Sequence, residues 1–285
     1  MTLRHGTHHR GDQHASPEAL YSRVVSPTIL LPVFPPLAKA LEAKPVDPSA
    51  MEGMAEIPYA LALRKVDFHL FRTPIPTSVM RTTGYGPNAF ALESFVDELA
   101  VEARADPYRY RRALLAHDAA AVAVLDRAAA LARWGSALPR GHGRGIAYTE
   151  AFGTRLAQVV ELAVRDDAVK LIRIVSVADC GRVLDPGIAR AGIEGGVVFG
   201  LAYCKSEITF RDGRAVEDNF DRYRLPTLAE TPVLVTDLLP RGGRLGGIGE
   251  TSPVTIPPAL ANAIFAASGR RLRSMPLARH GLHFT

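Results

Sequence analysis

The sequence is poor in cysteine and has no long uninterrupted hydrophobic run. Its 285 residues include two cysteines, Cys180 and Cys204, which could form at most one disulfide and are too few for a four-thiolate zinc or iron–sulfur site. The longest clean apolar stretch runs from Gly195 to Cys204, well short of the roughly 18 residues that a membrane-spanning helix needs. The sequence therefore predicts a protein that neither spans a membrane nor holds a cysteine-ligated cluster.

Common catalytic and nucleotide-binding signatures are also missing. No G-x-S-x-G turn is present to carry a nucleophilic serine, and no Lys-Ser or Lys-Thr follows a glycine-rich loop as a phosphate loop requires. Gly247 and Gly249 begin a G-x-G pattern, but the third position of a dinucleotide fingerprint falls on Ser252. These absences argue against a serine hydrolase and against a nucleotide-binding loop.

The positive charge does not indicate nucleic-acid binding. The net charge is +5 and the isoelectric point about 9.4, but the arginines are scattered along the chain. The densest group, Arg270, Arg271 and Arg273, follows a predicted helix end, where cations interact favourably with the helix dipole. No aromatic residues interleave it to stack on bases, so we expect no nucleic-acid partner.

The first 18 residues differ from the rest of the chain. They are polar and contain four of the nine histidines, His5, His8, His9 and His14. We expect residues 1–18 to be a disordered tail and residues 19–285 to be the folded part, with a histidine-bound metal in the tail as the alternative. The start of the chain lacks the apolar core of a secretory signal, which favours a cytoplasmic location. Six prolines between Ser26 and Pro48 predict an irregular crossing segment or linker.

The middle of the chain reads as one strand followed by helices. Val66, Phe68 and Leu70 alternate with their neighbours, which predicts a strand. Apolar residues from Ala89 recur at helical spacing, which predicts a helix that begins there. Asp106-Pro107 is typical of an N-cap followed by proline at the first helical position. A third helix is predicted from about 118 to 134, ending at Gly135.

The second half of the chain predicts a sheet with further helices. Residues 156–164 and 169–177 are rich in β-branched residues and flank a short turn, which indicates a hairpin. Asp185-Pro186 opens a helix that reaches about Cys204. A second hairpin around Asp212-Gly213, a strand over 233–238 and a last helix over 257–268 complete the prediction. Because helices and hairpins come in separate runs, the fold class is α+β.

A glycine-rich stretch between the last strand and the last helix is the main candidate site. Residues 242–249 contain five glycines, which allow the backbone to approach another group closely or to take positive φ angles. Glu250 follows directly, where a ligand could reach a carboxylate that acts as a general base. The alternative interpretation is a glycine-rich turn without function.

Several blocks, taken in order, resemble the molybdenum hydroxylases, the xanthine dehydrogenase and aldehyde oxidase family. Gly247-Ile248-Gly249-Glu250, followed by the segment from Pro257 to Phe265, is similar to the family's C-terminal signature. The other blocks are Met80-Arg81 with Gly84, Glu93-Ser94-Phe95, Gly145-Ile146-Ala147 leading to Phe152-Gly153, Asp179 to Pro186, Glu194-Gly195-Gly196, and Asn219-Phe220. The likeness is greatest to large (β) subunits of the isoquinoline 1-oxidoreductase type and covers residues 20 to 280.

The resemblance implies part of an α+β molybdopterin-binding domain. Such a domain holds molybdenum on a molybdopterin cytosine dinucleotide, and its electrons leave through an iron–sulfur small subunit. In this family Glu250 would be the catalytic base, no side chain would bind the metal directly, and Met80 and Arg81 would lie in a loop that reaches the metal centre. Backbone that packs against the cofactor would come from Gly246, Gly247, Ile248 and Gly249. The implied reaction hydroxylates an N-heteroaromatic or oxidises an aldehyde with water as the oxygen source.

The sequence departs from the family pattern in two ways. It resembles only the C-terminal part of the large subunit, so a separately encoded N-terminal half is the expected partner and would determine whether the assembly is exported to the periplasm. Gly192 stands where the family usually has glutamine, and Gln13 and Gln158 are the only glutamines in the chain. The alternatives are a truncated, catalytically silent domain and a repurposed binding module.

Overall fold

The computed structural model describes residues 17, 19–29, 34, 36, 46–75 and 77–285. Internal contacts divide the chain into two compact units, Met1–Val122 and Ala123–Thr285, and each is described by itself. The predicted tail, apart from Pro17, and most of the proline-rich segment lie outside the described residues. Within the described ranges, no helix is both long enough and apolar enough to cross a membrane.

The first unit contains a parallel pair of strands. Strand β1 (Ala19–Ser26) pairs with β2 (Leu63–Leu70) over the full length of both. The strand at 63–70 is confirmed, whereas β1 was missed because its partner lies more than forty residues away along the chain. A short 3₁₀ helix, η1 (Ser49–Met51), lies between the two strands in the sequence.

Two helices of the first unit are joined by a buried ion cluster. Helix α2 (Tyr85–Glu102) begins before the predicted Ala89, and α3 (Pro107–Leu114) starts as predicted, with the Asp106 side chain accepting from the Arg109 N–H at 2.9 Å. Arg111 Nε lies 2.8 Å from Glu93 Oε2 and Arg111 Nη1 lies 3.5 Å from Asp97 Oδ1, with all three side chains buried. Burial opposes the charge on Arg111, but the two carboxylates hold its pKa above the usual value.

The second unit is built on a five-stranded mixed sheet. Strands β3 (His142–Ala151), β4 (Thr154–Arg165) and β5 (Ala168–Asp179) form consecutive antiparallel pairs. Strand β8 (Val233–Leu238) and the short β9 (His283–Phe284) then pair with β5 in the parallel direction. The predicted hairpin and the 233–238 strand are confirmed, while β3 was not predicted as a strand and the two parallel pairings were not expected.

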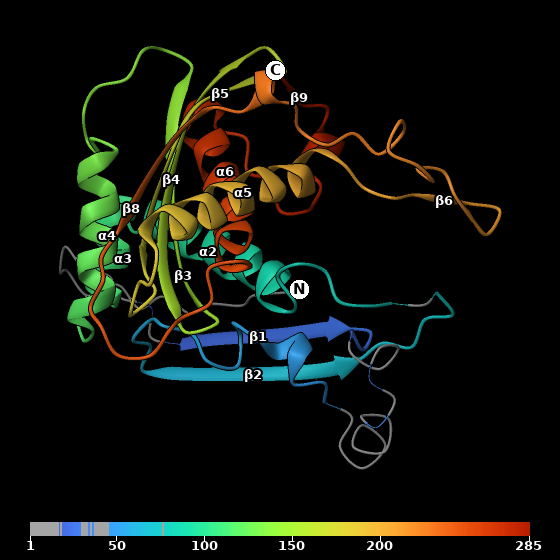
Figure 1. Cartoon of the computed structure of the whole chain (residues 1–285), viewed down its shortest axis with the longest axis horizontal. Helices are drawn as coiled ribbons and strands as arrows, with labels where there is room; N and C mark the ends of the chain where they lie inside the picture. Colours follow the sequence, from blue (N-terminus) through green and yellow to red (C-terminus); the bar gives the residue numbers. More distant parts are fainter. Residues whose placement is uncertain (1–16, 18, 30–33, 35, 37–45, 76) are drawn as a thin grey trace. The chain divides into compact units, whose positions relative to one another are not determined.

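Helices cover both faces of this sheet. Helices α5 (Pro186–Lys205) and α6 (Thr251–Ser268) lie against one face, and the end of α4 (Ala119–Leu131) lies against the other (Figure 1). On the α4 side, the guanidinium groups of Arg144 and Arg173 both contact Glu161, and Arg173 also donates to the Ala132 carbonyl at 3.1 Å. Burial would raise the pKa of Glu161, but the hydrogen bonds and charges of the two arginines lower it.

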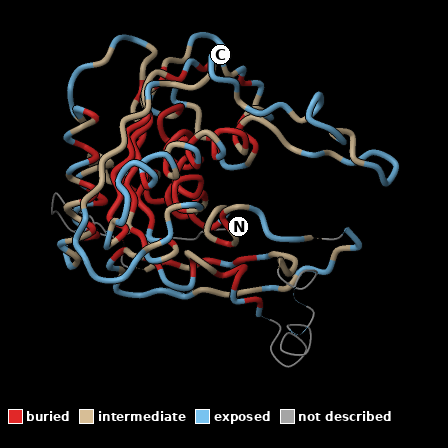
Figure 2. The backbone as a smooth tube through the Cα atoms, viewed as in Figure 1, coloured by how far each residue is buried: buried red, intermediate tan, exposed pale blue. Residues whose placement is uncertain are grey.

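The long helix α6 packs closely against β3 because two positions of that strand are glycine. A Cβ on Gly145 would overlap the backbone of Ala259 and Ala263, and a Cβ on Gly143 would overlap the backbone at Ala263 and Ala267. Fourteen consecutive α6 residues from Thr251 are buried, and Figure 2 shows this helix and the sheet strands as the most buried part of the unit. The helix starts before the predicted Pro257, so Pro257 and Pro258 lie inside it.

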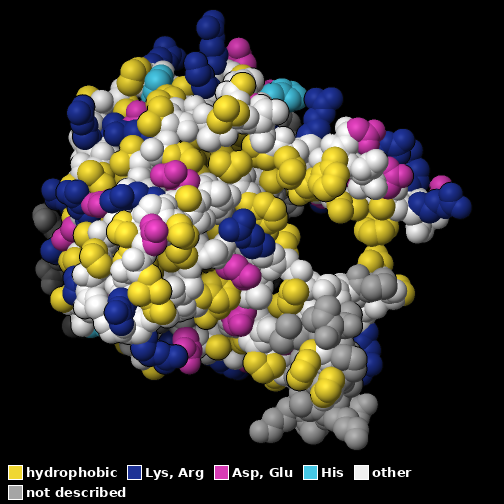
Figure 3. All heavy atoms as spheres, in the orientation of Figure 1, with side chains coloured by type: hydrophobic (Ala, Val, Ile, Leu, Met, Phe, Trp, Pro, Cys, Tyr) yellow, Lys and Arg dark blue, Asp and Glu magenta, His cyan; other side chains and the backbone are white. Residues whose placement is uncertain are grey.

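An exposed excursion separates α5 from β8. Residues 206–231, called the arm below, contain the two-residue strands β6 (Phe210–Arg211) and β7 (Arg214–Ala215) and the 3₁₀ helix η2 (Leu228–Glu230), which confirms the hairpin around Asp212-Gly213. No arm residue is buried. Figure 3 shows hydrophobic and charged side chains mixed on its surface. A last 3₁₀ helix, η3 (Leu277–His280), precedes β9.

Candidate functional site

The glycine-rich segment 241–249, called the glycine loop below, is anchored at the end of the sheet. The Gly246 N–H donates to the Cys180 carbonyl at 2.9 Å, and the Gly247 N–H donates to the Phe152 carbonyl at 2.8 Å. The Gly247 carbonyl accepts from the hydroxyls of Thr154 and Thr251 at 2.8 and 2.7 Å. The loop is therefore tied to the β3–β4 turn, to the end of β5 and to the start of α6.

One of the loop glycines is required by this close approach. A Cβ on Gly246 would overlap the Thr154 hydroxyl and the Gly153 carbonyl. Gly242 and Gly243 instead have positive φ angles of 75° and 81°, which glycine adopts readily. Both uses of glycine predicted from the sequence are thus present, in different parts of the loop. The threonine hydroxyls that bind Gly247 were not singled out in the sequence, because isolated threonines carry no pattern.

Ile248 connects the loop to the core. Its side chain packs against a buried cluster of Leu156, Ala178 and Ile193. Gly192, on α5, faces the same side chain, since a Cβ there would lie 3.5 Å from Ile248 Cδ1, an ordinary van der Waals distance. The position at which the family pattern has glutamine thus borders the glycine loop, and it carries no side chain in this protein.

Glu250 is the N-cap residue of α6. Its side chain makes no cap hydrogen bond, and it has no ion-pair or hydrogen-bond partner among the described residues. The residue is neither buried nor fully exposed, and a Cβ on the preceding Gly249 would meet nothing within 4 Å. The start of an 18-residue helix favours a negative charge. The half-buried Glu250 carboxylate thus has no internal partner among the described residues and follows a position that opens onto free space, so it could accept a proton from a ligand.

Met80 and Arg81 lie in the first unit, immediately before α2. Met80 is half exposed and its carbonyl accepts from the Thr83 N–H at 2.9 Å. Thr82 has a φ of 152°, and its buried hydroxyl has no hydrogen-bond partner in the part of the chain that the structure describes. The predicted site residues therefore fall into two groups. The five consecutive residues from Gly246 to Glu250 belong to the second unit, and Met80 and Arg81 belong to the first.

The residues next to the loop at the end of β5 have structural contacts. Asp179 is buried, accepts from the Gly181 N–H at 3.1 Å, and lies 3.7 Å from Arg155 Nη1 and 3.6 Å from Arg241 Nε. Cys180 and Cys204 are buried free thiols. Burial raises the pKa of both thiols, which disfavours the reactive thiolate form.

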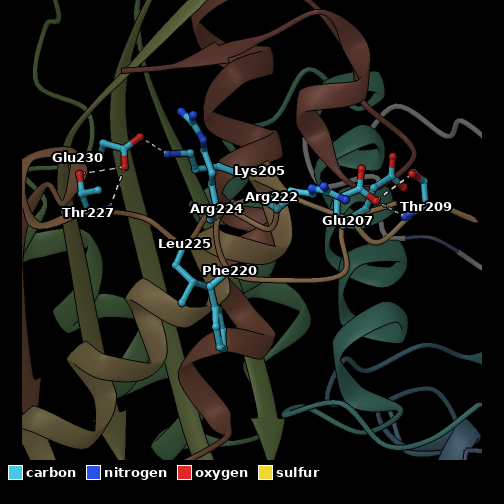
Figure 4. Close-up of a pocket in the computed structure, with 11 residues that line it drawn as sticks. Lys205, Glu207, Thr209, Phe220, Arg222, Arg224, Leu225, Thr227 and Glu230 are labelled. Carbon is cyan, nitrogen blue, oxygen red and sulfur yellow. Dashed lines mark hydrogen bonds and ion pairs between the residues drawn. The ribbon is translucent and has the colours of Figure 1, made fainter. Parts of the chain in front are cut away.

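A separate pocket lies at the base of the arm. It has a volume of about 770 Å³, and none of its lining residues belongs to the glycine loop. Figure 4 shows Lys205 and Thr227 both contacting Glu230. The ammonium and hydrogen bonds around Glu230 lower its pKa to about 2. These contacts fasten the arm to the end of α5. Within the described ranges, no group of three or more His, Cys, Asp or Glu side chains could hold a metal ion.

Comparison with known proteins identifies the family. Residues 91–232 match the model of the molybdopterin cofactor-binding domain. The β subunit of isoquinoline 1-oxidoreductase from Brevundimonas diminuta is 28% identical over 265 residues, which are 91% of this chain and 34% of that protein. A nicotinate dehydrogenase chain from Pseudomonas putida is 31% identical over 77% of this chain and 20% of its own length. The chain belongs to the molybdenum hydroxylase family.

Solved structures show the same fold. Quinoline 2-oxidoreductase from Pseudomonas putida 86 aligns with a TM-score of 0.69 at 12% identity, over 93% of this chain and 59% of its own. The aldehyde oxidoreductase from Desulfovibrio desulfuricans aligns with a TM-score of 0.70 at 12% identity, over 93% of this chain and 47% of its own. The predicted α+β molybdopterin-binding fold is confirmed.

The matches cover part of this chain and part of each relative. The chain spans about a third or less of the length of the curated relatives above. The family-model match ends before the glycine loop and Glu250, and it begins after Met80 and Arg81. Those site residues therefore remain predictions, supported by the local geometry of the loop.

Proposed function

We propose that this chain supplies the catalytic carboxylate of a molybdenum-dependent oxidoreductase, and that Glu250 is that carboxylate. The observation that carries the proposal is the position of Glu250 at the start of α6, next to Gly249, whose Cβ position opens onto free space, with no partner for the Glu250 oxygens among the described residues. A carboxylate without an internal partner is available to a bound ligand, whereas one in an ion pair would first have to leave it.

The residues on this side of the site fit a molybdopterin cofactor. Gly247 and Gly249 expose main chain without side chains, so a large polar ligand could approach the backbone closely. The bound cofactor would supply the two-electron oxidation. Glu250 would accept the proton that is released from water during that oxidation, and the glycine loop would orient the ligand against it. The anchoring of the loop by Thr154 and Thr251 limits its movement while this happens.

The finer parts of the proposal come from the relatives. Two curated relatives are named isoquinoline 1-oxidoreductase and nicotinate dehydrogenase, and another is the molybdenum-binding subunit of an aldehyde oxidoreductase from Escherichia coli. An N-heteroaromatic compound or an aldehyde is therefore the proposed substrate class. We propose a molybdopterin cytosine dinucleotide as the form of the cofactor, and an iron–sulfur subunit as the electron acceptor. The part of the large subunit that lies outside this chain would complete the cofactor site. A cytoplasmic location is proposed unless that part directs export.

The test is to express the chain alone and together with the remaining part of a large subunit and an iron–sulfur subunit, and to measure molybdenum by elemental analysis. We expect molybdenum in the co-expressed complex, and activity that is abolished in Glu250→Gln while the metal content is unchanged. Asp218→Asn, which removes an exposed carboxylate of the arm, should leave both unchanged. A Glu250→Gln complex that kept its metal and its activity would refute the assignment.

A specific observation favours a second candidate, a domain that folds without binding the cofactor. Gly192 borders the glycine loop but offers no side-chain amide, and each missing hydrogen bond to a buried polar ligand would cost roughly 1 to 3 kcal/mol. Absence of molybdenum from every co-expressed complex, with the chain folded and bound to its partners, would support this catalytically silent form.

A further inference from the structure

The turn that follows Met80 and Arg81 has a strained backbone. Thr82 and Thr83 have φ angles of 152° and 48°, on the positive side of φ, where a β-branched residue such as threonine is an outlier. Backbone of this kind costs free energy and persists only when neighbouring structure holds it in place. The turn therefore needs contacts from elsewhere in the chain.

Glu52 supplies such contacts. Its carboxylate accepts hydrogen bonds from the Thr83 hydroxyl and, at 3.3 Å, from the Gly84 N–H, and both end on Oε2. Gly84 is the N-cap residue of α2 and has no side chain with which to cap the helix. Glu52 thus takes over the role of a capping side chain, and its negative charge is favourable at the start of an 18-residue helix.

The main chain around Glu52 is itself fixed against α2. The Asn88 side-chain amide donates to the carbonyls of Ala50 and Glu52 at 2.9 and 2.8 Å. A Cβ on Gly84 would overlap the Ser49 carbonyl, so η1 and the start of α2 are in direct backbone contact. These contacts do not involve the Glu52 side chain. Removing the carboxylate should therefore release the turn while leaving η1 packed on α2.

The turn carries two side chains that the sequence predicts to lie at the cofactor. Met80 is half exposed and Arg81 is partly buried. We propose that Glu52 is a positioning residue, which holds the Thr82-Thr83 turn in its strained shape and thereby fixes where Met80 and Arg81 meet a bound ligand. Its effect on catalysis rests on the proposed function, whereas its hold on the turn does not.

The first experiment is limited trypsin digestion of the chain alone, because the Arg81–Thr82 bond lies in the turn. Cleavage requires local opening, so its rate reports how often the turn is released. Glu52→Ala loses two hydrogen bonds to a charged group and should speed cleavage after Arg81 by about tenfold. Cleavage after Arg104, which is exposed just beyond the far end of α2, should not change. Equal cleavage after Arg81 in Glu52→Ala and the unmodified protein would overturn the proposal.

Matched variants identify the bond responsible. Glu52→Gln keeps an oxygen acceptor and should stay within about twofold of the unmodified protein. Thr83→Val should speed cleavage, and Glu52→Ala/Thr83→Val should be no faster than Glu52→Ala, because both changes break the same bond. Multiplied effects in the double variant would contradict the assigned contact. Glu56→Ala removes an exposed carboxylate with no partner among the described residues and should match the unmodified protein.

The second experiment uses the co-expressed complex. A displaced turn misplaces groups at the reacting centre, so Glu52→Ala should lower kcat per bound molybdenum by about tenfold and leave KM within about twofold. Glu52→Gln should restore most of that loss. A lower molybdenum content or Tm with kcat per molybdenum unchanged would show a structural role alone and overturn the positioning role. An inactive unmodified complex, or activity retained in Glu250→Gln, would instead refute the proposed function, and the trypsin rates would still decide whether Glu52 holds the turn.

Discussion

Two adjacent glycines in α5 should respond in opposite directions to the same substitution. A Cβ on Gly195 would meet nothing within 4 Å, whereas a Cβ on Gly196 would overlap the Ser252 hydroxyl and lie 2.9 Å from Pro253 Cδ. Both positions are within the helix. Alanine in place of glycine inside a helix stabilises by about 0.5 to 1 kcal/mol when nothing else changes. Gly195→Ala should therefore gain roughly that amount.

Gly196→Ala would create a clash between the packed helices α5 and α6. The Ser252 hydroxyl donates to the Ile193 carbonyl at 2.8 Å, so displacing it costs a hydrogen bond of about 1 kcal/mol. Forcing α5 and α6 apart adds about 1 to 3 kcal/mol of overpacking. After the gain in helix propensity, the net destabilisation should be about 1 to 3 kcal/mol, which corresponds to a fall in Tm of roughly 2 to 12 °C.

Urea unfolding followed by circular dichroism would measure both variants. The double variant Gly196→Ala/Ser252→Ala separates the two causes, because it removes the nearer of the two clashing atoms. It should recover part of the lost stability, with the Pro253 contact accounting for the remainder. Equal stabilities of Gly195→Ala and Gly196→Ala would show that α5 and α6 do not pack as described.

Three further predictions concern other parts of the chain. Arg111→Met leaves the buried carboxylates of Glu93 and Asp97 without the positive charge between them and should destabilise by about 3 to 5 kcal/mol. Arg222→Ala, which breaks an exposed pair, should cost under about 1 kcal/mol in the same unfolding assay. Glu230 has a pKa of about 2, below its usual 4.5, so its contribution is present above pH 4.5 and lost as the pH falls towards 2. The stability difference between the unmodified protein and Glu230→Gln should shrink over that range, and a difference that grew on acidification would contradict the assigned contacts. Gly192→Gln should stabilise modestly, by about 0.5 kcal/mol, because its Cβ has room and glutamine has a higher helix propensity than glycine, and it should increase molybdenum retention in the co-expressed complex. No change in metal content would show that the missing amide is not limiting.

Local signals in the sequence were sufficient for much of the fold. Asp106 and Asp185 each cap a helix whose first residue is proline, and both side chains accept from the backbone as predicted. The turn at Asp166 and Asp167 joins β4 to β5 as predicted. In each case, residues close together in the sequence make the contact, so the pattern and the structure report the same interaction.

The elements that were missed depend on partners far away in the sequence. Strand β3 contains Gly143 and Gly145, which have low strand propensity and are needed because α6 packs against them. The first turns of α6 precede Pro257 and Pro258, which normally belong at a helix start, and burial of the helix overrides that preference. The position of Glu250 as the N-cap follows from this earlier start. The sequence singled out Glu250 as a candidate base, but its place at the start of α6 depends on how the helix packs in the core.

The arm also bears on how this fold can diverge. It is inserted between α5 and β8, two elements that are already in contact with the core, and none of its residues is buried. Changes in its exposed side chains would therefore leave the packing of the sheet intact, so the chemistry of this part of the surface can change without a compensating change in β5 or α6.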